Sequence, residues 1–347
     1  MSRPVEVEGA TFAEHTTLRV GGAVDTWVIA RTEEACIEAI VECDDLGREV
    51  VVVGGGSNIF CSDDPLAGTV VQIACTGESF EERDGFIHAR VAAGEEWDAF
   101  VVRSLENGSG FLAPLSGIPG LVGATPIQNV GAYGTEVSEV ITAVRVWDRR
   151  NRTLRTLTAE DCAFRYRWSA FKDDPDAFVV LGVEFMLPMD EQVVVAYPQL
   201  ASELGVPQGS AAAGSAVREA VLRLRQRKGM VLDDDDHDTW SVGSFFVNPI
   251  VASDVAATLP EQCPTYPAET GVKVSAAWLI EASGVEPGFA LPDSRARVST
   301  KHTLALCNAG SASSEDVVEL ARVIKDRVIA CFGIELQPEP RLVGVRV

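Results

Sequence analysis

Apolar and polar residues alternate along this chain with two different periods, and these predict helices and strands in mixed order. Helical spacing of apolar residues predicts helices over Glu33–Asp45, Trp97–Glu106, 211–228 and 276–283. Runs rich in β-branched and aromatic residues predict strands at 51–53, 244–247 and 305–308. This order favours an α+β architecture over a strict alternation of strand and helix.

The clearest helix begins after Ser313, where Asp316 completes the pattern of a capping box. The apolar residues at helical spacing in this segment are Val317, Leu320, Val323, Ile324 and Val328. Gly333 is expected to end the helix, and residues 334–336 to begin a last strand.

At 347 residues the chain has room for two or three domains. It shows neither a secretory signal nor a run of about 18 apolar residues that could span a membrane. The eight cysteines are scattered without a C-x-x-C pair. We therefore expect reduced thiols, a cytoplasmic protein and no metal site.

The balance of charge is strongly acidic, with 29 Lys and Arg against 51 Asp and Glu and a formal net charge of −22. This excludes nucleic acid and anionic membranes as expected partners. Five cations gather in 218–228, which favours an anion-facing segment, with an ordinary solvated helix face as the alternative: Arg218, Arg223, Arg225, Arg227 and Lys228. The acidic run 233–236, with His237 and Asp238, is interpreted as a solvated loop and a plausible boundary.

Two glycine-rich segments are candidates for ligand binding. Residues 54–58, Gly-Gly-Gly-Ser-Asn, follow a predicted strand and suit either a diphosphate or a tight turn. Residues 115–134 combine five glycines with few charges, which suits a backbone wrapped around a flat ligand or a buried structural loop. The G-x-G-x-x-A match at 108–113 follows a predicted helix, and no P-loop is present, so neither standard nucleotide motif applies.

Three polar residues stand in unusual surroundings. Arg167 lies in Phe-Arg-Tyr-Arg-Trp, Ser244 in Gly-Ser-Phe-Phe, and Glu339 between two prolines. An arginine fork suits a carboxylate or an enolate, and a serine hydroxyl can protonate a strong carbon base. Taken singly, Arg167 is more often a snorkelling surface arginine and Ser244 a structural serine, and Glu339 could be a surface acid.

Together these segments resemble the UDP-N-acetylmuramate dehydrogenases, also called UDP-N-acetylenolpyruvoylglucosamine reductases. The resemblance extends over nearly the whole chain, and Tyr266 in Thr-Tyr-Pro-Ala-Glu indicates the longer type with a tyrosine loop. It is carried by 17–22, 54–58, 115–134, 166–172, 243–249, 301–306 and 338–339.

The resemblance implies an α+β fold of the vanillyl-alcohol-oxidase type, with FAD held by two subdomains and a third domain for the substrate. The expected boundaries are 1–75 plus 335–347, 76–228 and 229–334. The implied reaction is NADPH-dependent reduction of UDP-N-acetylglucosamine-enolpyruvate. It is a step of peptidoglycan synthesis, and it therefore serves cell-wall biogenesis, cell shape and cell division. Hydride from flavin N5 adds to the vinyl CH₂. Arg167 and Glu339 then steady the enolate, and Ser244 protonates it.

The resemblance also implies binding residues. For FAD these are Gly54, Gly55, Gly56, Ser57, Asn58, Ser116, Gly117, Ile118, Pro119, Gly120, Gly123, Ala124, Gln128, Asn129, Gly131, Ala132 and Tyr133. For the substrate they are Tyr166, Tyr197, Lys228, Asn248 and Tyr266.

Two departures from the family pattern stand near these residues. Trp168 occupies a position where relatives often carry an acid, and the acidic run lengthens the approach to Ser244. The alternatives left open are another FAD oxidoreductase of the same fold and a non-catalytic sugar-nucleotide binding protein. The only expected partner is the small-molecule substrate, and the protein is expected to be a monomer.

Overall fold

The computed structural model describes residues 4–347, and these form two compact units. Unit 1 comprises Val24–Gly55, Ala67–Arg227 and the described residues up to Ala10. Unit 2 comprises Thr11–Ala23, Gly56–Leu66 and Lys228–Val347. The chain thus passes between the units several times, and the three-domain division remains a prediction.

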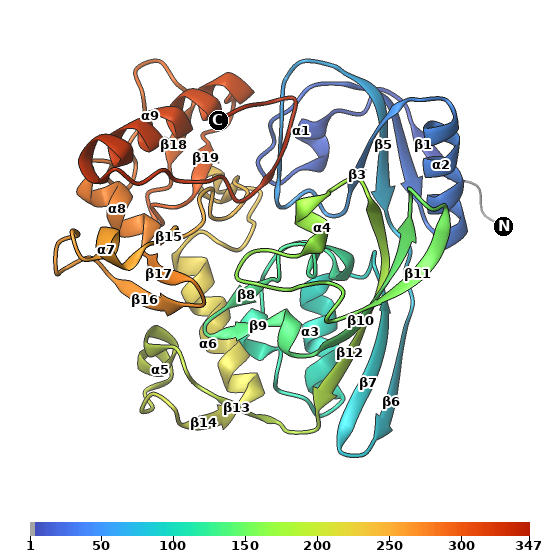
Figure 1. The fold of residues 1–347 in the computed structure, drawn as a ribbon, viewed down its shortest axis with the longest axis horizontal. Coiled ribbons are helices and arrows are strands. Elements are labelled where there is room, and N and C mark those ends of the chain that lie inside the picture. Colours follow the sequence, from blue (N-terminus) through green and yellow to red (C-terminus); the bar gives the residue numbers. More distant parts are fainter. Residues whose placement is uncertain (1–3) are drawn as a thin grey trace. The chain divides into compact units, whose positions relative to one another are not determined.

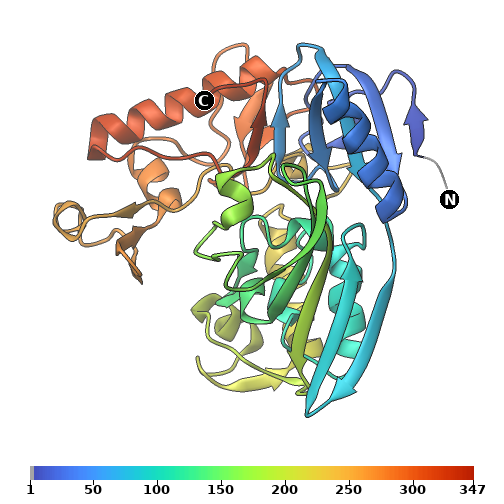
Figure 2. The same ribbon diagram turned by 45° about the vertical axis from the view of Figure 1, so that its right-hand side comes forward.

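The two larger sheets of unit 1 have four and five strands (Figure 1). The first has the order β1 (Val5–Val7), β2 (Val24–Ala30), β5 (Leu66–Ile73) and β3 (Glu49–Val53), and α2 (Glu33–Asp45) packs on it. The second is antiparallel, with the order β11 (Thr153–Thr158), β10 (Ile141–Asp148), β12 (Phe178–Pro188), β7 (Phe86–Ala92) and β6 (Glu78–Arg83). Figure 2 shows β6, β7 and β12 side by side along their length.

Helix α3 (Trp97–Glu106) covers the inner face of the five-stranded sheet, and its bounds are those predicted. The ring of Phe100 lies 4.9 Å from that of Phe185 on β12, and both are fully buried. The indole N–H of Trp97 donates to the carbonyl of Leu115 at 3.0 Å. Burial of such a side chain contributes roughly 1.5–3 kcal/mol, so α3 is a firm support for the loop that begins at Leu115.

Short elements connect the larger ones in unit 1. They are η1 (Ala113–Leu115), η2 (Val122–Ala124), β8 (Gly131–Ala132), β9 (Thr135–Glu136), η3 (Val137–Glu139), α4 (Ala170–Asp173), β13 (Gln192–Val194), α5 (Pro198–Leu204) and β14 (Ala211–Ala213). The helix predicted over 211–228 begins only at Gly214, as α6 (Gly214–Arg227). The prediction was wrong for Ala211–Ala213, because these alanines pair with β13 across an antiparallel ladder that overrides their helical propensity.

Unit 2 has a core of its own beneath α8 (Ala276–Ala282) and α9 (Ser314–Phe332). Its strands are β4 (Ile59–Cys61) parallel to β20 (Arg341–Val343), β15 (Ile250–Val251), β17 (Gly271–Val274), β16 (Thr265–Ala268), β18 (Ala296–Val298) and β19 (Leu306–Asn308). Its shorter helices are α1 (Phe12–His15), η4 (His237–Thr239) and α7 (Ser253–Ala256).

The strand expected at 334–336 does not form, although Ile334 and Leu336 are buried and Glu335 is exposed as a strand would require. The following prolines, Pro338 and Pro340, have no N–H to extend a ladder. The last strand therefore starts only at Arg341, in β20.

Seven of the eight cysteines are buried and all are reduced. Burial raises the pKa of Cys61, Cys162 and Cys307 to about 12. Thiols of this kind stay protonated at neutral pH and act as small apolar side chains rather than nucleophiles.

Helix α9 begins and ends as its sequence predicts. The Ser313 hydroxyl accepts from the amide of Asp316 at 3.1 Å, and the Asp316 carboxylate accepts from the amide of Ser313 at 2.8 Å. Gly333 follows the last turn with φ of 67°. The sequence therefore specifies both ends of this helix locally.

Replacing Ser313 with alanine should destabilise unit 2 by about 1 kcal/mol, since the N-terminal amides of α9 lose their acceptor. We expect its melting transition to fall by about 2–4 °C in a calorimetric scan. Ser202→Ala is the control: Ser202 is exposed in α5 and its hydroxyl has no hydrogen bond within residues 4–347. Equal shifts for the two variants would contradict the capping role.

Candidate active site

In unit 1 the predicted catalytic arginine sits on a tight turn. The main chains of Arg165 and Trp168 exchange hydrogen bonds of 3.0 and 3.2 Å, which leaves Tyr166 and Arg167 at the tip. Arg167 has φ of 52°, a conformation that non-glycine residues adopt at a cost. Such a backbone persists only where its surroundings hold it in place.

The guanidinium of Arg167 holds the turn against the 115–134 loop. Its Nη2 donates to the carbonyl of Gly131 at 2.6 Å, and its Nη1 donates to the carbonyl of Asn129 at 3.4 Å. The Arg165 side chain instead lies 4.7 Å above the Trp168 ring and has no acidic partner within residues 4–347. The Arg165 guanidinium therefore has a cation–π contact with Trp168.

Asn129 is the centre of this part of the loop. It is buried, with φ of 47°, and its Nδ2 donates to Glu136 at 2.7 Å and to the carbonyl of Arg165 at 3.1 Å. Its Oδ1 accepts from the amide of Ser138 at 3.1 Å. The side chain thus ties the loop, β9 and the Arg167 turn together.

The first half of the 115–134 loop is packed closely against α3 and α6. Gly117 has φ of 68°, and a Cβ there would come within 2.7 Å of Leu222. A Cβ on Gly123 would collide with Ala93. Gly117 suits its position through its positive φ, whereas Gly123 is required because a Cβ there would meet the main chain of Ala93.

The Gly117 main chain is held by charged side chains that the sequence analysis had not connected. Its N–H donates to Asp98 Oδ1 at 2.6 Å, and its carbonyl accepts from Arg225 Nε at 3.1 Å. Arg218 grips the same Asp98 carboxylate through two hydrogen bonds of 2.6 and 2.7 Å. Burial opposes ionisation of Asp98, but the hydrogen bonds from Arg218 and Gly117 outweigh it and lower its pKa.

Part of the basic cluster of 218–228 thus forms ion pairs with acidic side chains of the protein. Arg218 pairs with Asp98, while Arg223 and Arg227 both pair with Glu203 on α5. These three cations therefore pair with protein acids rather than being left for an anionic ligand. The carboxylates of Asp98 and Glu203 lie 120, 20 and 24 residues away in sequence and are brought in by folding.

Two predicted ligand-contacting tyrosines also meet in unit 1. The rings of Tyr133 and Tyr197 lie 5.6 Å apart in an edge-to-face arrangement, and Tyr197 precedes the first turn of α5. Burial raises the pKa of Tyr133, although the charge of Arg225 opposes the rise. The phenol is therefore neutral at physiological pH, and Tyr197 remains partly exposed.

The glycine run fits an anionic ligand. In unit 1, a Cβ on Gly55 would lie 3.1 Å from Gly120 Cα, so main chains meet there. In unit 2, Gly56 has φ of 66° and is buried, and a Cβ would collide with the carbonyl of His15. The amides of Gly55, Gly56 and Asn58 donate to no acceptor in the described chain. Of the three residues Gly56 is buried, Asn58 half-buried and Gly55 exposed, so a diphosphate could reach these amides and accept from them.

In unit 2 the main chain brings Ser244 and Glu339 together. The carbonyl of Phe245 accepts from the amide of Glu339 at 2.8 Å, and Phe246 pairs with Pro338 in a single bridge. On its other side Ser244 pairs with Ala305, and the amide of Phe245 donates to the carbonyl of Leu304 at 2.7 Å. The continuous strand predicted over 244–247 was wrong, because each partner offers only one bridge and Pro338 has no N–H.

The Ser244 side chain is available for chemistry. Phe245 and Phe246 are fully buried and fix the segment, while Ser244 itself is half-buried. Its hydroxyl makes no hydrogen bond to any residue of 4–347. The half-buried hydroxyl is therefore not engaged by the protein and can face a ligand or solvent.

The remaining predicted substrate residues of unit 2 lie on separate elements. Asn248 Oδ1 accepts from the amide of Ala276 at 2.9 Å and so supports the start of α8. Tyr266 is on the β16–β17 hairpin, exposed, with the Lys273 ammonium 5.7 Å above its ring. Lys228 directly follows α6.

The acidic run before Ser244 is only partly solvated. Asp234 and Asp236 form ion pairs with Arg19 and Lys301. Asp238 is buried, and its carboxylate accepts from the Ser299 hydroxyl at 3.0 Å and the Thr300 amide at 3.1 Å. The solvated-loop prediction was wrong for Asp238, since its partners Ser299 and Thr300 lie 61 and 62 residues further along the chain.

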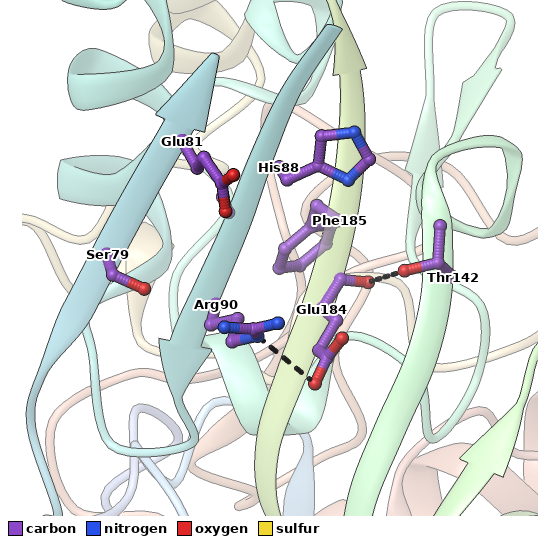
Figure 3. Close-up of a pocket in the computed structure, with 8 residues that line it drawn as sticks. Ser79, Glu81, His88, Arg90, Thr142, Glu184 and Phe185 are labelled. Carbon is purple, nitrogen blue, oxygen red and sulfur yellow. Dashed lines mark hydrogen bonds and ion pairs between the residues drawn. The ribbon is translucent and has the colours of Figure 1, made fainter. Parts of the chain in front are cut away.

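Other FAD candidates lie within the loops already described, and none lines the small cavity in Figure 3. That cavity lies on the outer face of the five-stranded sheet and has a volume of about 50 Å³. Its lining includes Arg90 and Glu184, paired at 3.6 Å. A site for an organic ligand usually needs about 300 Å³ or more, so this cavity is too small to hold a flavin.

Two protein-family models match separate parts of this chain. Residues 24–157 match the model of the FAD binding domain, and residues 235–343 match that of the UDP-N-acetylenolpyruvoylglucosamine reductase C-terminal domain. The reductase of that name from Saccharopolyspora erythraea is 48% identical over 96% of this chain and 95% of its own length. The one from Cutibacterium acnes is 48% identical over 98% of this chain and 91% of its own.

The chain belongs to the UDP-N-acetylenolpyruvoylglucosamine reductase family. The crystal structure of UDP-N-acetylenolpyruvylglucosamine reductase from Thermus caldophilus superposes with a TM-score of 0.66 at 21% identity, covering 99% of this chain and all of that one. This confirms the predicted α+β fold with its FAD-binding part.

Membership in the reductase family confirms an FAD-dependent oxidoreductase of peptidoglycan precursor synthesis. Within residues 4–347 there is no cluster of three His, Cys, Asp or Glu side chains that could hold a metal ion. No helix in that range is long and apolar enough to cross a membrane.

Proposed function

We propose that the protein reduces UDP-N-acetylglucosamine-enolpyruvate to UDP-N-acetylmuramate, with Ser244 as the proton donor. The observation that carries this proposal is the free Ser244 hydroxyl, on a main chain pinned beside Glu339. The family to which the chain belongs supports the substrate. Bound FAD would supply the hydride, taken from NADPH, that adds to the vinyl carbon of the substrate.

The FAD would be held by the 54–58 and 115–134 segments. The amides of Gly55, Gly56 and Asn58 would bind its diphosphate. The remaining loop residues offer main-chain groups at positions fixed by Gly117 and Asn129. Such preformed donors bind without first ordering a flexible segment.

Arg167 and Glu339 would bind the enolpyruvyl carboxyl group. Addition of hydride to the CH₂ carbon places negative charge on the carbon that bears the carboxylate. The guanidinium of Arg167 can share that charge through the oxygens, since its fork matches a carboxylate in two-point contact. Glu339 must then be protonated, or hydrogen-bonded to the carboxyl group, to lie beside it.

Ser244 would complete the reaction. A serine hydroxyl is too weak an acid to protonate most groups, but an enolate carbon is a strong base and takes its proton. The proton moves from Ser244 Oγ to the carbon that bears the carboxylate, and the alkoxide regains a proton from solvent. In this role the serine is never a nucleophile.

Substrate contacts are assigned to residues around these groups. Tyr197 would lie against the uracil, and Lys228 and Asn248 would contact the diphosphate. Tyr166 and Tyr266 would also bind the substrate. We also place the protein in the cytoplasm as a monomer, in a pathway that sustains cell shape and division.

The purified protein should be yellow. Its flavin absorbance should be bleached by NADPH under anaerobic conditions and restored by UDP-N-acetylglucosamine-enolpyruvate, as followed by absorbance spectroscopy. Protein that is colourless and binds no added FAD would contradict the proposal. Reduction by NADPH without reoxidation by this substrate would point instead to another FAD oxidoreductase of the same fold.

Ser244→Ala should lower turnover by roughly 10²–10⁴-fold, the usual loss for a general acid. Flavin reduction by NADPH, measured by stopped-flow absorbance, should stay near the wild-type rate and serves as the internal control. Ser244→Cys should retain part of the activity, since a thiol can still donate a proton. Equal slowing of both half-reactions in Ser244→Ala would instead identify a structural serine.

Arg167→Lys should lower turnover by roughly 10–100-fold, since hydrogen bonds to a charged group contribute about 1.5–3 kcal/mol. An ammonium cannot reach the carbonyls of Asn129 and Gly131 and still present a planar fork to a carboxylate. Arg165→Lys is the matched control and should stay near wild type in steady-state assays. Wild-type turnover in Arg167→Lys would remove Arg167 from the site.

A further inference from the structure

Both main-chain polar groups of Gly117 form hydrogen bonds with side chains, one on helix α6 and one on helix α3. Its N–H donates to Asp98, which Arg218 grips in turn, and its carbonyl accepts from Arg225. Arg218, Leu222 and Arg225 are spaced i, i+4 and i+7, so they form one stripe of α6. Leu222 lies where a Cβ on residue 117 would be, which fixes the same position by packing.

The ion pair between Arg218 and Asp98 is mostly shielded from solvent. The side chains of Arg218 and Asp98 are 19% and 29% exposed, and both oxygens of Asp98 take a hydrogen bond from the guanidinium. A bidentate pair of this kind restricts rotation of both side chains. Asp98 Oδ1 carries two bonds at once, from Arg218 and from Gly117.

The residues that follow Gly117 have main-chain donors with no acceptor. Neither the amide of Ile118 nor that of Gly120 donates to any acceptor in the part of the chain that the structure describes. Gly117 and Gly120 both have positive φ, 68° and 114°. Because glycine adopts positive and negative φ about equally readily, contacts with neighbouring residues select the orientation of these amides.

We propose that Asp98 and Arg218 are positioning residues that lock Gly117, so that the Ile118 and Gly120 amides are fixed donors for the flavin. This rests on the proposal that the 115–134 loop holds FAD. Asp98 and Arg218 do not themselves touch the flavin in this account. They act through the conformation of the loop, and therefore on FAD affinity before any catalytic step.

The test is the dissociation constant of FAD for reconstituted apoprotein, measured by quenching of flavin fluorescence. Asp98→Ala removes the acceptor of the Gly117 amide and the partner of Arg218, and should weaken FAD binding about tenfold or more. Asp98→Asn keeps an acceptor for Gly117 but loses the charge, and should weaken binding by a smaller factor, about threefold. The geometry thus predicts a larger FAD dissociation constant for Asp98→Ala than for Asp98→Asn, and a larger one for Asp98→Asn than for the wild type. If Asp98→Ala does not fold, the dissociation constant of Asp98→Asn alone tests the proposal.

A matched control separates positioning from stability. Asp44 and Arg149 form an ion pair of similar exposure in the same unit, 21% and 14%, with no bond to the 115–134 loop. Asp44→Asn should lower the melting temperature of the apoprotein about as much as Asp98→Asn, with no change in the FAD dissociation constant.

Two results would overturn the proposal. Wild-type FAD affinity in the Asp98 variants, with only a loss of melting temperature like that of Asp44→Asn, would show that the ion pair is structural. Wild-type apoprotein that binds no FAD would overturn both this inference and the proposed function. The two failures differ because only the second appears without any substitution.

Discussion

The chemistry proposed for this protein depends on a short piece of main chain that is held from two sides. Residues 244–247 pair with Leu304 and Ala305 on one side and with 337–339 on the other, while two buried phenylalanines fill the core below. This pairing sets Ser244 beside Glu339 through backbone bonds alone. The serine side chain is then free, because nothing about its position depends on a bond from its hydroxyl.

In unit 1 the candidate site segments are also fixed in position, but by side-chain hydrogen bonds. There the loop 115–134 and the Arg167 turn contain several residues with positive φ, and these are stabilised by buried polar side chains rather than by strand pairing. Asn129 and the Asp98–Arg218 pair each bind main-chain groups from more than one segment. A ligand that meets such a loop finds its donors already ordered, so less of the binding free energy is lost in ordering the chain.

Local signals in the sequence were sufficient for the regular elements. The bounds of α3 and both ends of α9 follow from apolar spacing and capping residues, which act within a few positions. The candidate site could be located from its unusual composition, since glycine runs and the Gly-Ser-Phe-Phe segment stand out without any knowledge of the fold. The family resemblance added the roles of Arg167, Ser244 and Glu339.

What the sequence could not reveal were partnerships made at a distance. Asp98 looks like an ordinary acid in the first turn of a helix, and only folding brings Arg218 to it across 120 residues. Asp238 likewise looked like the end of an acidic loop until its partners at 299–300 were seen. The strand predicted at 244–247 failed for the same reason, because ladder formation depends on the partner segments as much as on the strand itself.

The most direct test of the account is a crystal structure of the protein with FAD and the enolpyruvyl sugar nucleotide. We expect Ser244 Oγ at roughly 3–3.5 Å from the carbon that bears the carboxylate, the distance of a group about to react. The Arg167 guanidinium and Glu339 should contact the carboxylate itself. A substrate bound with that carbon far from Ser244, and with its carboxylate held by other residues, would contradict the proposed mechanism.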